Sequence, residues 1–261
     1  MFDKLEDKYI ITGILRCTTG IFIGGNSNAF EPHAIDNIVI KDSRGLPFIP
    51  GSSLKGVLRS YLERVLRSVG NNVCMVPKLC SEKYNSKEKR KRLLESLKDK
   101  NTNKNETAIL SQEIYNNLCE ICHLFGSEVT AAKLSIRDLK IIEESFKGFE
   151  FRTGNSINRD KNKAEQGHLY EMEIVPADTL FDMKLVLENP DDKDLKNTVF
   201  LLKSMIQGDL SIGGKTSRGL GGFIIENINI KKLRKDNIID SLLQNKKDNI
   251  EIDDLLKEME V

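Results

Sequence analysis

Apolar residues alternate or recur at helical spacing in most of this chain, and these patterns predict its regular elements. Runs rich in β-branched residues, or with clean alternation of apolar and polar positions, predict four strands, at residues 9–17, 133–142, 179–187 and 223–230. Apolar residues at helical spacing predict two long helices, one that follows Pro50-Gly51 and one from about 190 to 206. The resulting order is strand, helix, strand, strand, helix, strand.

This order is that of a ferredoxin-like α+β fold, in which two helices cover one face of an antiparallel sheet. We therefore expect a single domain whose core consists of residues 9–67, 133–144 and 178–230. Residues 68–132, with a highly charged helical run, form an insert, and residues 149–175 form two extended pieces around a polar tip. Residues 231–261 are expected to be an amphipathic helical tail.

Composition limits the function classes that remain. The chain has 261 residues, of which 39% are hydrophobic and 30% charged, so it is expected to be globular with a sizeable core. No apolar run is long enough to span a bilayer, and the first eight residues are charged, unlike a signal sequence. A net charge of +1 means that any nucleic-acid surface must be a local patch. Five cysteines in such a chain favour a reducing compartment, and we expect a cytoplasmic location.

The start of the first helix is a candidate anion site. Ser52, Ser53, Lys55 and Arg59 follow Pro50-Gly51, and either serine is expected to cap the helix. Hydroxyls, free amide groups and a lysine in the first turn together favour a phosphate. An ordinary capped helix would show the same pattern, so this stretch leaves both interpretations open.

A glycine-rich run at 213–222 is the second candidate, and it contains Lys215, Ser217 and Arg218. Gly214-Lys215-Thr216 resembles the end of a nucleotide-binding phosphate loop, but Asp209 occupies the place of that motif's first glycine, and a helix rather than a strand precedes it. We therefore expect glycines that let the backbone approach a sugar-phosphate chain closely. The alternative is a flexible turn.

Cysteine spacing predicts a metal site. Cys119-x-x-Cys122 has a spacing common in zinc sites, and two further cysteines, Cys74 and Cys80, lie upstream in the same insert. Four thiolates in two pairs can close a tetrahedral structural zinc site, with His123 as a reserve ligand. Unrelated buried thiols are the alternative. Cys17 lies inside a predicted strand and is expected in the core.

Several stretches, taken in order, resemble a known family. They are Ile23-Gly24-Gly25, Ala34-Ile35-Asp36-Asn37, Pro50-Gly51-Ser52-Ser53-Leu54-Lys55-Gly56, Leu124-Phe125-Gly126-Ser127 and the run at 213–222. No single motif is specific, but the ordered set, over residues 9–230, resembles the repeat-associated (RAMP) backbone subunits of type III CRISPR RNA-guided complexes, the Cas-seven group. The cysteine insert is similar to that of zinc-bearing, type III-D-like members.

The resemblance implies a modified RNA-recognition-type ferredoxin fold. It implies copies of the chain stacked along a guide RNA, other effector subunits as partners, and a complementary target RNA. The hairpin at 149–175, with Arg152 before its tip and Arg159 in it, would be the thumb that disturbs the guide–target duplex. In target-cleaving members the aspartate that matches Asp36 cuts the target with a divalent ion, for which Mg²⁺ is expected, and leaves a 2′,3′-cyclic phosphate and a 5′-hydroxyl. His33 can assist, although a lone loop histidine is usually incidental.

Two functions from different classes therefore remain open. The protein is either a guide-binding subunit that is also a metal-dependent endoribonuclease, or a binding scaffold whose target is cut elsewhere in the complex. Asp36 favours the first. A stand-alone RNA-processing enzyme would call for a histidine-centred site, which a chain with three histidines, one of them beside Cys122, supports poorly.

Overall fold

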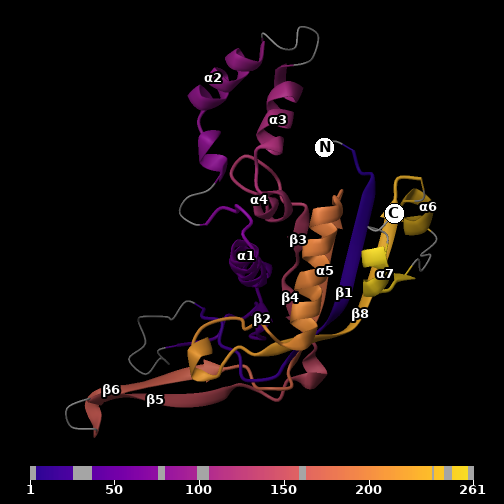
Figure 1. Ribbon diagram of the computed structural model, residues 1–261. Helices are drawn as coiled ribbons and strands as arrows, with labels where there is room; N and C mark the ends of the chain where they lie inside the picture. The colour runs from indigo at the N-terminus through magenta and orange to yellow at the C-terminus, as the bar shows by residue number, and fades with distance from the viewer. Residues whose placement is uncertain are drawn as a thin grey trace.

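The computed structural model has a mixed α/β architecture built on an antiparallel sheet (Figure 1). It describes residues 4–25, 37–75, 80–98, 106–158, 163–236, 238–243 and 249–257. The main sheet has the order β2-β4-β7-β1-β8-β9, with β3 also paired to β7, and β5 and β6 form a separate two-stranded sheet. No helix in the described part of the chain is long and apolar enough to cross a membrane.

Strand β1 (Asp7–Cys17) is the centre of the sheet. It pairs antiparallel along its length with β7 (Leu180–Glu188) on one side and β8 (Phe223–Arg234) on the other. From Tyr9 to Cys17 every second residue of β1 is buried, as the predicted strand pattern requires for a sheet with one covered face. Cys17 is fully buried, and burial raises the pKa of its thiol to about 12, which confirms its place in the core.

Two short strands replace the single strand expected at 133–142. They are β3 (Leu134–Ile136) and β4 (Leu139–Ile141), and both pair with β7. The strand is interrupted at Arg137-Asp138 because Gly51, the first residue of the first helix, packs directly on this backbone. A Cβ on Gly51 would lie 2.4 Å from the Ile136 carbonyl oxygen, and Asp138 Oδ1 accepts the Gly51 N–H at 2.8 Å. The edge strand β2 (Phe48–Ile49) pairs with β4.

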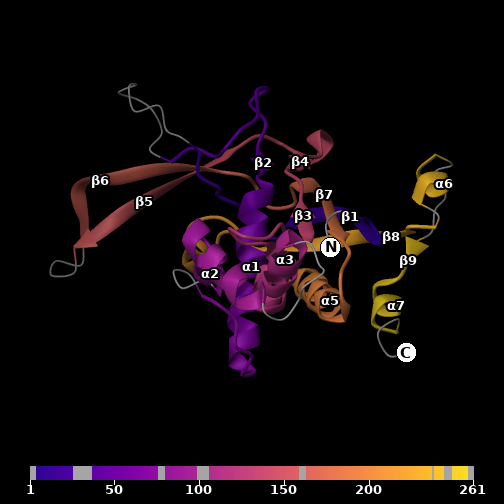
Figure 2. The same cartoon turned by 90° about the horizontal axis from the view of Figure 1, so that it is seen from above.

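Helices α1 (Gly51–Ser68) and α5 (Asp192–Gln207) lie on the same side of the sheet (Figure 2). The N-cap residue of α1 is Pro50, whose side chain cannot accept a hydrogen bond, so the expected cap by Ser52 or Ser53 is wrong. The Asp138 carboxylate instead accepts the N–H of Gly51, the first helical residue. Helix α5 begins with a capping box in which the side chains of Asp191 and Asp194 accept each other's backbone N–H.

The insert is helical and stands at one end of the sheet (Figure 1). It contains the 3₁₀ turn η1 (Cys80–Lys83), α2 (Lys87–Lys98), α3 (Glu106–Asn116) and α4 (Glu120–Phe125). Helix α4 packs against α1 and α5 and contributes the buried residues Ile121, Leu124 and Phe125 to the core. The base of the insert is thus continuous with the core of the domain.

A long hairpin projects from the other end of the sheet (Figure 1). It follows the 3₁₀ turn η2 (Glu143–Ser145) and consists of β5 (Glu150–Asn158) and β6 (Lys163–Ile174), which pair antiparallel with a register shift between Asn155 and Ile157. The two extended pieces predicted at 149–175 are therefore paired strands. Of the polar tip expected at 158–167, residues 159–162, which include Arg159, lie outside the described residues, and Asn158 and Lys163 pair across the hairpin.

The tail at 231–261, expected to be helical, is helical only in part. Residues up to Arg234 extend β8, because they continue its pairing with the start of β1. The described remainder comprises α6 (Ile238–Leu243), the edge strand β9 (Asn249–Ile250) paired with β8, and α7 (Ile252–Lys257), which packs on α5 through the buried Leu255. Sheet pairing thus overrides the helical pattern in the first residues of the tail.

A buried ion pair joins Lys133, the residue that follows the insert, to α5. The side chain of Lys133 is 4% exposed and that of Asp194 is 2% exposed, and the ammonium donates a short hydrogen bond to the carboxylate. Asp191 lies 3.3 Å from the same ammonium, and the Tyr115 ring lies 5.4 Å away. Hydrogen bonds to Asp194 and Tyr115 and the charges of both aspartates raise the pKa of Lys133 despite the opposing effect of burial.

We predict that Lys133→Met lowers the free energy of unfolding by about 3–5 kcal/mol, because it leaves a buried carboxylate without its cation. The matched control is Lys193→Met, which removes an ammonium that is 72% exposed and lies 3.2 Å from Glu120. An exposed pair of this kind is worth about 0–1 kcal/mol. Urea unfolding measures both variants, and equal losses would contradict a structural role for the buried pair.

Candidate functional site

The glycine-rich loop, the residues just before it and α1 from Ser53 to Arg64 line an open cavity of about 730 Å³. Its lining is rich in hydroxyl groups, which come from Ser53, Ser60, Ser211, Thr216 and Ser217, and it also includes Arg64 and Asp209. Two regions that are remote in sequence, each predicted to contact a phosphate chain, therefore face one another. Of the predicted residues, Ser53 and Ser217 line this cavity.

The glycines of this loop allow a close approach to the chain that follows β1. Gly213 has φ +87°, and a Cβ there would lie 2.2 Å from the Phe22 carbonyl oxygen. The next residue, Gly214, donates its N–H to that oxygen at 2.8 Å, and Gly221 donates to Gly20 at 2.8 Å. The loop is thus ordered against residues 20–22 and leads into strand β8. Its Gly-Lys-Thr therefore lacks the strand-to-helix context of a nucleotide-binding phosphate loop.

The two cations of the loop meet the base of the hairpin. Arg218, in the 3₁₀ turn η3 (Thr216–Arg218), donates to the Tyr170 hydroxyl at 2.5 Å, and Lys215 Nζ lies 5.5 Å from the centre of the Tyr170 ring. Tyr170 in turn packs on Gly154 of the opposite strand, where a Cβ would lie 2.3 Å from the ring. Tyr170 thus joins the predicted cationic loop to the hairpin, and no sequence motif pointed to it.

On α1, the predicted residues divide into two groups. Ser52 is exposed, and Lys55 is half-buried, with a pKa lowered by burial and by the nearby Arg59 charge. The Arg59 guanidinium is only 22% exposed: its Nε donates to Glu63 at 2.9 Å and its Nη1 to the Gly126 carbonyl at 3.1 Å. Arg59 therefore uses its donors inside the protein rather than at the cavity.

Four predicted side chains remain, and the structure describes one of them. Arg152 is exposed on β5, close to the hairpin base. Asp36, the predicted catalytic residue, and His33 both lie outside the described residues, as does Arg159.

The segment that follows Asp36 is anchored by a residue that the sequence did not reveal. Glu173 on β6 is 4% exposed; its carboxylate accepts the Val39 N–H at 3.0 Å and the Lys41 ammonium at 2.7 Å. Its own N–H donates to the Asn37 carbonyl at 2.9 Å. Glu173 therefore fixes residues 37–41 to the hairpin base. An acid within a strand carries no motif, so only the structure could identify it.

The four cysteines of the insert form a candidate metal centre. Their sulfur atoms all lie within 4.8 Å of one another. The Cys74 sulfur lies 3.4 Å from those of Cys119 and Cys122, and the Cys80 sulfur lies 3.8 Å and 3.4 Å from the same two. Four thiolates around a zinc ion at about 2.3 Å would lie about 3.8 Å apart, so the donor set and its spacing fit a tetrahedral ion.

The sulfur atoms of the centre interact with one another and with one backbone donor. The Cys119 N–H points to the Cys80 sulfur at 3.5 Å, and hydrogen bonds among the thiols lower the pKa of Cys119 and raise the pKa values of Cys80 and Cys122. His123 is turned away, since its Nε2 lies 2.7 Å from the Tyr115 carbonyl oxygen and its ring stacks on that of Tyr115. The four cysteines thus converge without the reserve ligand.

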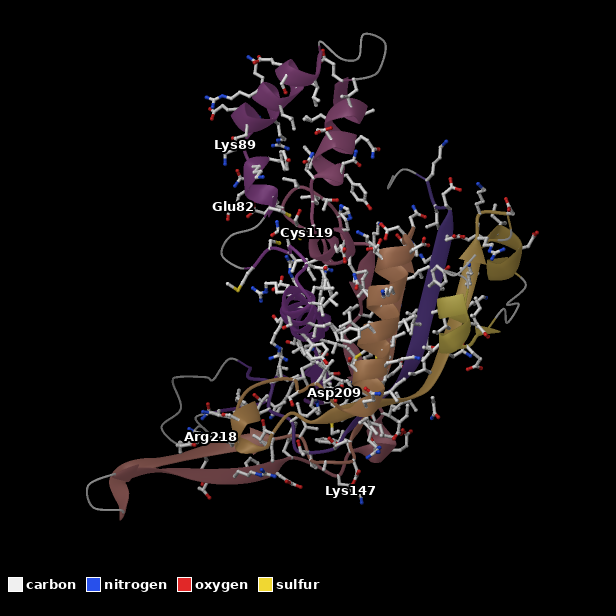
Figure 3. All side chains as sticks on the ribbon, in the orientation of Figure 1. Glu82, Lys89, Cys119, Lys147, Asp209 and Arg218 are labelled. Carbon is white, nitrogen blue, oxygen red and sulfur yellow. The ribbon has the colours of Figure 1, made fainter. Side chains whose placement is uncertain are left out.

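The cavity follows α1 from Ser53 to Arg64, whereas the metal centre lies at the base of the insert. Figure 3 shows Cys119 at the base of the insert, and Asp209 and Arg218 toward the end from which the hairpin projects. The predicted site residues therefore form two sites, one of soft metal ligands and one of hydroxyls, glycines and cations.

Comparisons with known proteins identify relatives of this chain. The sequence model described as the RAMP superfamily matches residues 14–224. A protein of Methanothermobacter thermautotrophicus named CRISPR system Cms endoribonuclease Csm3 is 27% identical over 258 residues, covering 88% of each chain. A protein of the same name from Methanocaldococcus jannaschii is 28% identical over 234 residues, covering 83% of this chain and 78% of that one. A Streptococcus thermophilus protein of that name is 48% identical over 52 residues, which are 20% of this chain and 24% of that one.

Proposed function

This chain belongs to the RAMP superfamily, and we propose that it is a guide-RNA-binding backbone subunit of a type III CRISPR effector complex that also cuts complementary target RNA. The observation that carries the proposal is the match over residues 14–224, which contains both walls of the hydroxyl-lined cavity. Relatives that cover most of the chain are named endoribonucleases of a CRISPR system. The alternative is a scaffold subunit that binds guide RNA and does not cut.

We further propose that the core is ferredoxin-like, in the modified form of an RNA-recognition fold. Support comes from the strand order β4-β7-β1-β8 with α1 and α5 on one face of the sheet. In that fold the two halves of a βαβ-βαβ chain interleave, so the first and third core strands are neighbours at the centre. Here those strands are β1 and β7.

The guide backbone is proposed to run along the cavity between α1 and the glycine-rich loop. Its contacts would come from Ser52, Ser53, Lys55, Lys215, Ser217 and Arg218, with Arg152 and Arg159 on the hairpin meeting the guide–target duplex. Hydroxyls, backbone amides and cations suit a sugar-phosphate chain and read no base sequence. Arg59 is left out of this set because Glu63 and Gly126 occupy its donors.

Cleavage is proposed to depend on Asp36 and a divalent cation, with Mg²⁺ the expected ion. RNA carries its own nucleophile, the 2′-hydroxyl, and a carboxylate beside it can take the proton when the geometry is in line. The anchoring of residues 37–41 by Glu173 supports a defined path for the chain next to Asp36. The expected partners are guide RNA, target RNA, other effector subunits and further copies of this chain stacked along the guide.

The cysteine centre is proposed to hold a structural Zn²⁺. Four soft ligands with no open position suit a structural rather than a catalytic ion. Such a site needs reduced cysteines, which supports a cytoplasmic location for the complex.

We predict about one zinc ion per purified chain, detected by elemental analysis. Cys122→Ser should lose most of this metal and some stability, because metal binding and folding are coupled in such sites. Cys17→Ala, which removes a buried thiol outside the centre, should retain the metal. A metal-free preparation as stable as the metal-loaded protein would contradict the structural role.

Guide binding should be sequence-tolerant and weaken as salt rises. Lys55→Ala and Lys215→Ala should each reduce the slope of log affinity against log salt by about 0.7, the loss expected for one phosphate contact to single-stranded RNA. Lys196→Ala, on the exposed side of α5, is the charge-matched control. Filter binding with two unrelated guides measures the effect, and a loss confined to one guide would mean that these lysines read bases.

Asp36→Ala should leave assembly, guide loading and target affinity intact and lower the cleavage rate by about 10²–10⁴-fold, the usual contribution of acid–base catalysis. Single-turnover cleavage of labelled complementary RNA in Mg²⁺ and in EDTA measures it, with Asp36→Asn as the gentler variant and Asp42→Asn as the control. A target with a 2′-deoxy sugar at the cut should resist the parent complex. Cleavage by Asp36→Ala at the parent rate would favour the scaffold alternative.

A further inference from the structure

Among the described residues that line the hydroxyl-rich cavity, Asp209 alone carries a carboxylate. Asp209 and Ser211 are exposed to the cavity and alternate along the chain with Leu210 and Ile212, which are buried. Figure 3 shows Asp209 where α5 ends. A carboxylate repels phosphate groups, so its presence in a cavity that suits a sugar-phosphate chain needs an explanation other than phosphate binding.

The stability of α5 does not explain this aspartate. Asp209 follows Gly208, the left-handed C-cap of the helix, and its N–H donates to the Ser204 carbonyl oxygen at 3.1 Å. The C-terminal end of a helix carries a partial negative charge, which disfavours a nearby anion and favours a cation. The last turn of α5 contains no basic residue that would offset this effect. The carboxylate therefore lies where the helix dipole opposes it.

A role in shaping the loop does not explain it either. Within the part of the chain that the structure describes, no hydrogen bond or ion pair holds the Asp209 side chain. Asp42 shows the usual structural role of such a residue, because its carboxylate accepts the N–H groups of Arg44 and Leu46 in a turn. The Asp209 carboxylate has all of its acceptor capacity left for a ligand.

The cation of the same cavity, Arg64, is packed in place and also left unpaired. Its guanidinium lies 5.5 Å from the centre of the Tyr61 ring, and that ring stacks on Phe200 at 5.8 Å. The Tyr61 hydroxyl lies 3.5 Å from Oγ of Ser204, the residue whose carbonyl accepts the Asp209 N–H. Arg64 forms no ion pair with any other described residue, so Arg64 and Asp209 share one cavity without neutralising each other.

An RNA backbone offers one repeated group that suits each of these side chains. Its phosphates only accept hydrogen bonds, and they suit a guanidinium. Its 2′-hydroxyl can donate, and this is the group by which a protein distinguishes RNA from DNA. A carboxylate only accepts hydrogen bonds, so the 2′-hydroxyl is the backbone group that can bind it. Because every ribonucleotide carries this hydroxyl, such a contact agrees with sequence-tolerant binding.

We propose that the Asp209 carboxylate accepts a hydrogen bond from a 2′-hydroxyl of the guide, while Arg64 contacts a neighbouring phosphate. Asp209 is thus a specificity residue that selects ribose over deoxyribose in the strand that occupies the cavity. This inference rests on the proposed guide-binding function and adds to it the recognition of the sugar. A strand that lacks the 2′ donor meets only the repulsion between the carboxylate and its phosphates.

The test compares two oligonucleotides of one sequence, an RNA and its 2′-fluoro analogue, which keeps the sugar conformation of RNA and has no 2′ donor. Filter binding to the purified full-length chain in EDTA should show that the parent prefers RNA. Asp209→Ala should weaken RNA binding about tenfold, as expected for one hydrogen bond to a charged group, and should not weaken binding of the 2′-fluoro strand. Asp209→Asn keeps a neutral acceptor and should fall between the two, and it decides the question if Asp209→Ala unfolds.

Two further variants separate the sugar contact from general electrostatics. Arg64→Gln removes a phosphate contact, so it should weaken both strands alike and reduce the slope of log affinity against log salt by about 0.7. Asp236→Ala is the charge-matched control and should match the parent. This exposed aspartate lies just beyond Arg234, which pairs with Asp7 at the far end of β1 from the cavity. Urea unfolding should find Asp209→Ala at least as stable as the parent, because it removes an anion beside a helix C-terminus.

The outcomes separate this inference from the function on which it rests. A parent that binds neither strand would overturn the guide-binding function and the inference with it. A parent that binds both strands equally, or an Asp209→Ala variant that keeps the parent's preference, would overturn the inference alone. An equal gain for both strands in Asp209→Ala would mean that the carboxylate only repels the backbone. A preference for RNA that requires Mg²⁺ would mean that Asp209 acts through a cation, and it too would overturn the direct contact.

Discussion

The antiparallel pairing of β1 with both β7 and β8 is the constraint on which the rest of the structure depends. Because both neighbours run antiparallel to β1, the C-terminal end of β1 and the N-terminal ends of β7 and β8 lie at the same end of the sheet. The segment after β1, the hairpin before β7 and the glycine-rich loop before β8 must therefore meet there. Their hydrogen bonds follow from this, since Ile21 pairs with Val175 and Gly221 donates to Gly20.

The cavity at this end of the sheet is lined by small polar groups because the glycine-rich loop and the segment after β1 approach one another closely. Gly213 and Gly221 have left-handed backbone conformations with no room for a Cβ, and hydroxyls line the cavity that remains. The loop cations Lys215 and Arg218 are not part of this lining, and Tyr170 holds them against the hairpin. This arrangement suits a continuous phosphate chain better than a compact nucleotide, and it agrees with a net charge that is near neutral overall.

Helix α1 runs between this end of the sheet and the insert at the opposite end. Its residues from Ser53 to Arg64 line the cavity, while Arg59, paired with Glu63, donates to the Gly126 carbonyl at the end of α4. On the side of α5, Glu120 of the insert lies 3.2 Å from Lys193, and the residue that follows the insert, Lys133, forms a buried ion pair with Asp194. The insert is therefore held by polar contacts to both long helices, in addition to the apolar packing of α4.

The sequence alone determined the features that depend on local spacing. Richness in β-branched residues identified β1, alternation identified β7, and helical periodicity identified α1 and α5. The Cys-x-x-Cys spacing identified a cluster that the fold brings together. Contacts between remote segments decided the rest. Pairing with β1 turned the first residues of the tail into strand, and the start of α1 divided the strand at 133–142. Neither the inward turn of Arg59 nor the roles of Glu173 and Tyr170 has a local signal, because burial and partner are properties of packing rather than of neighbouring residues.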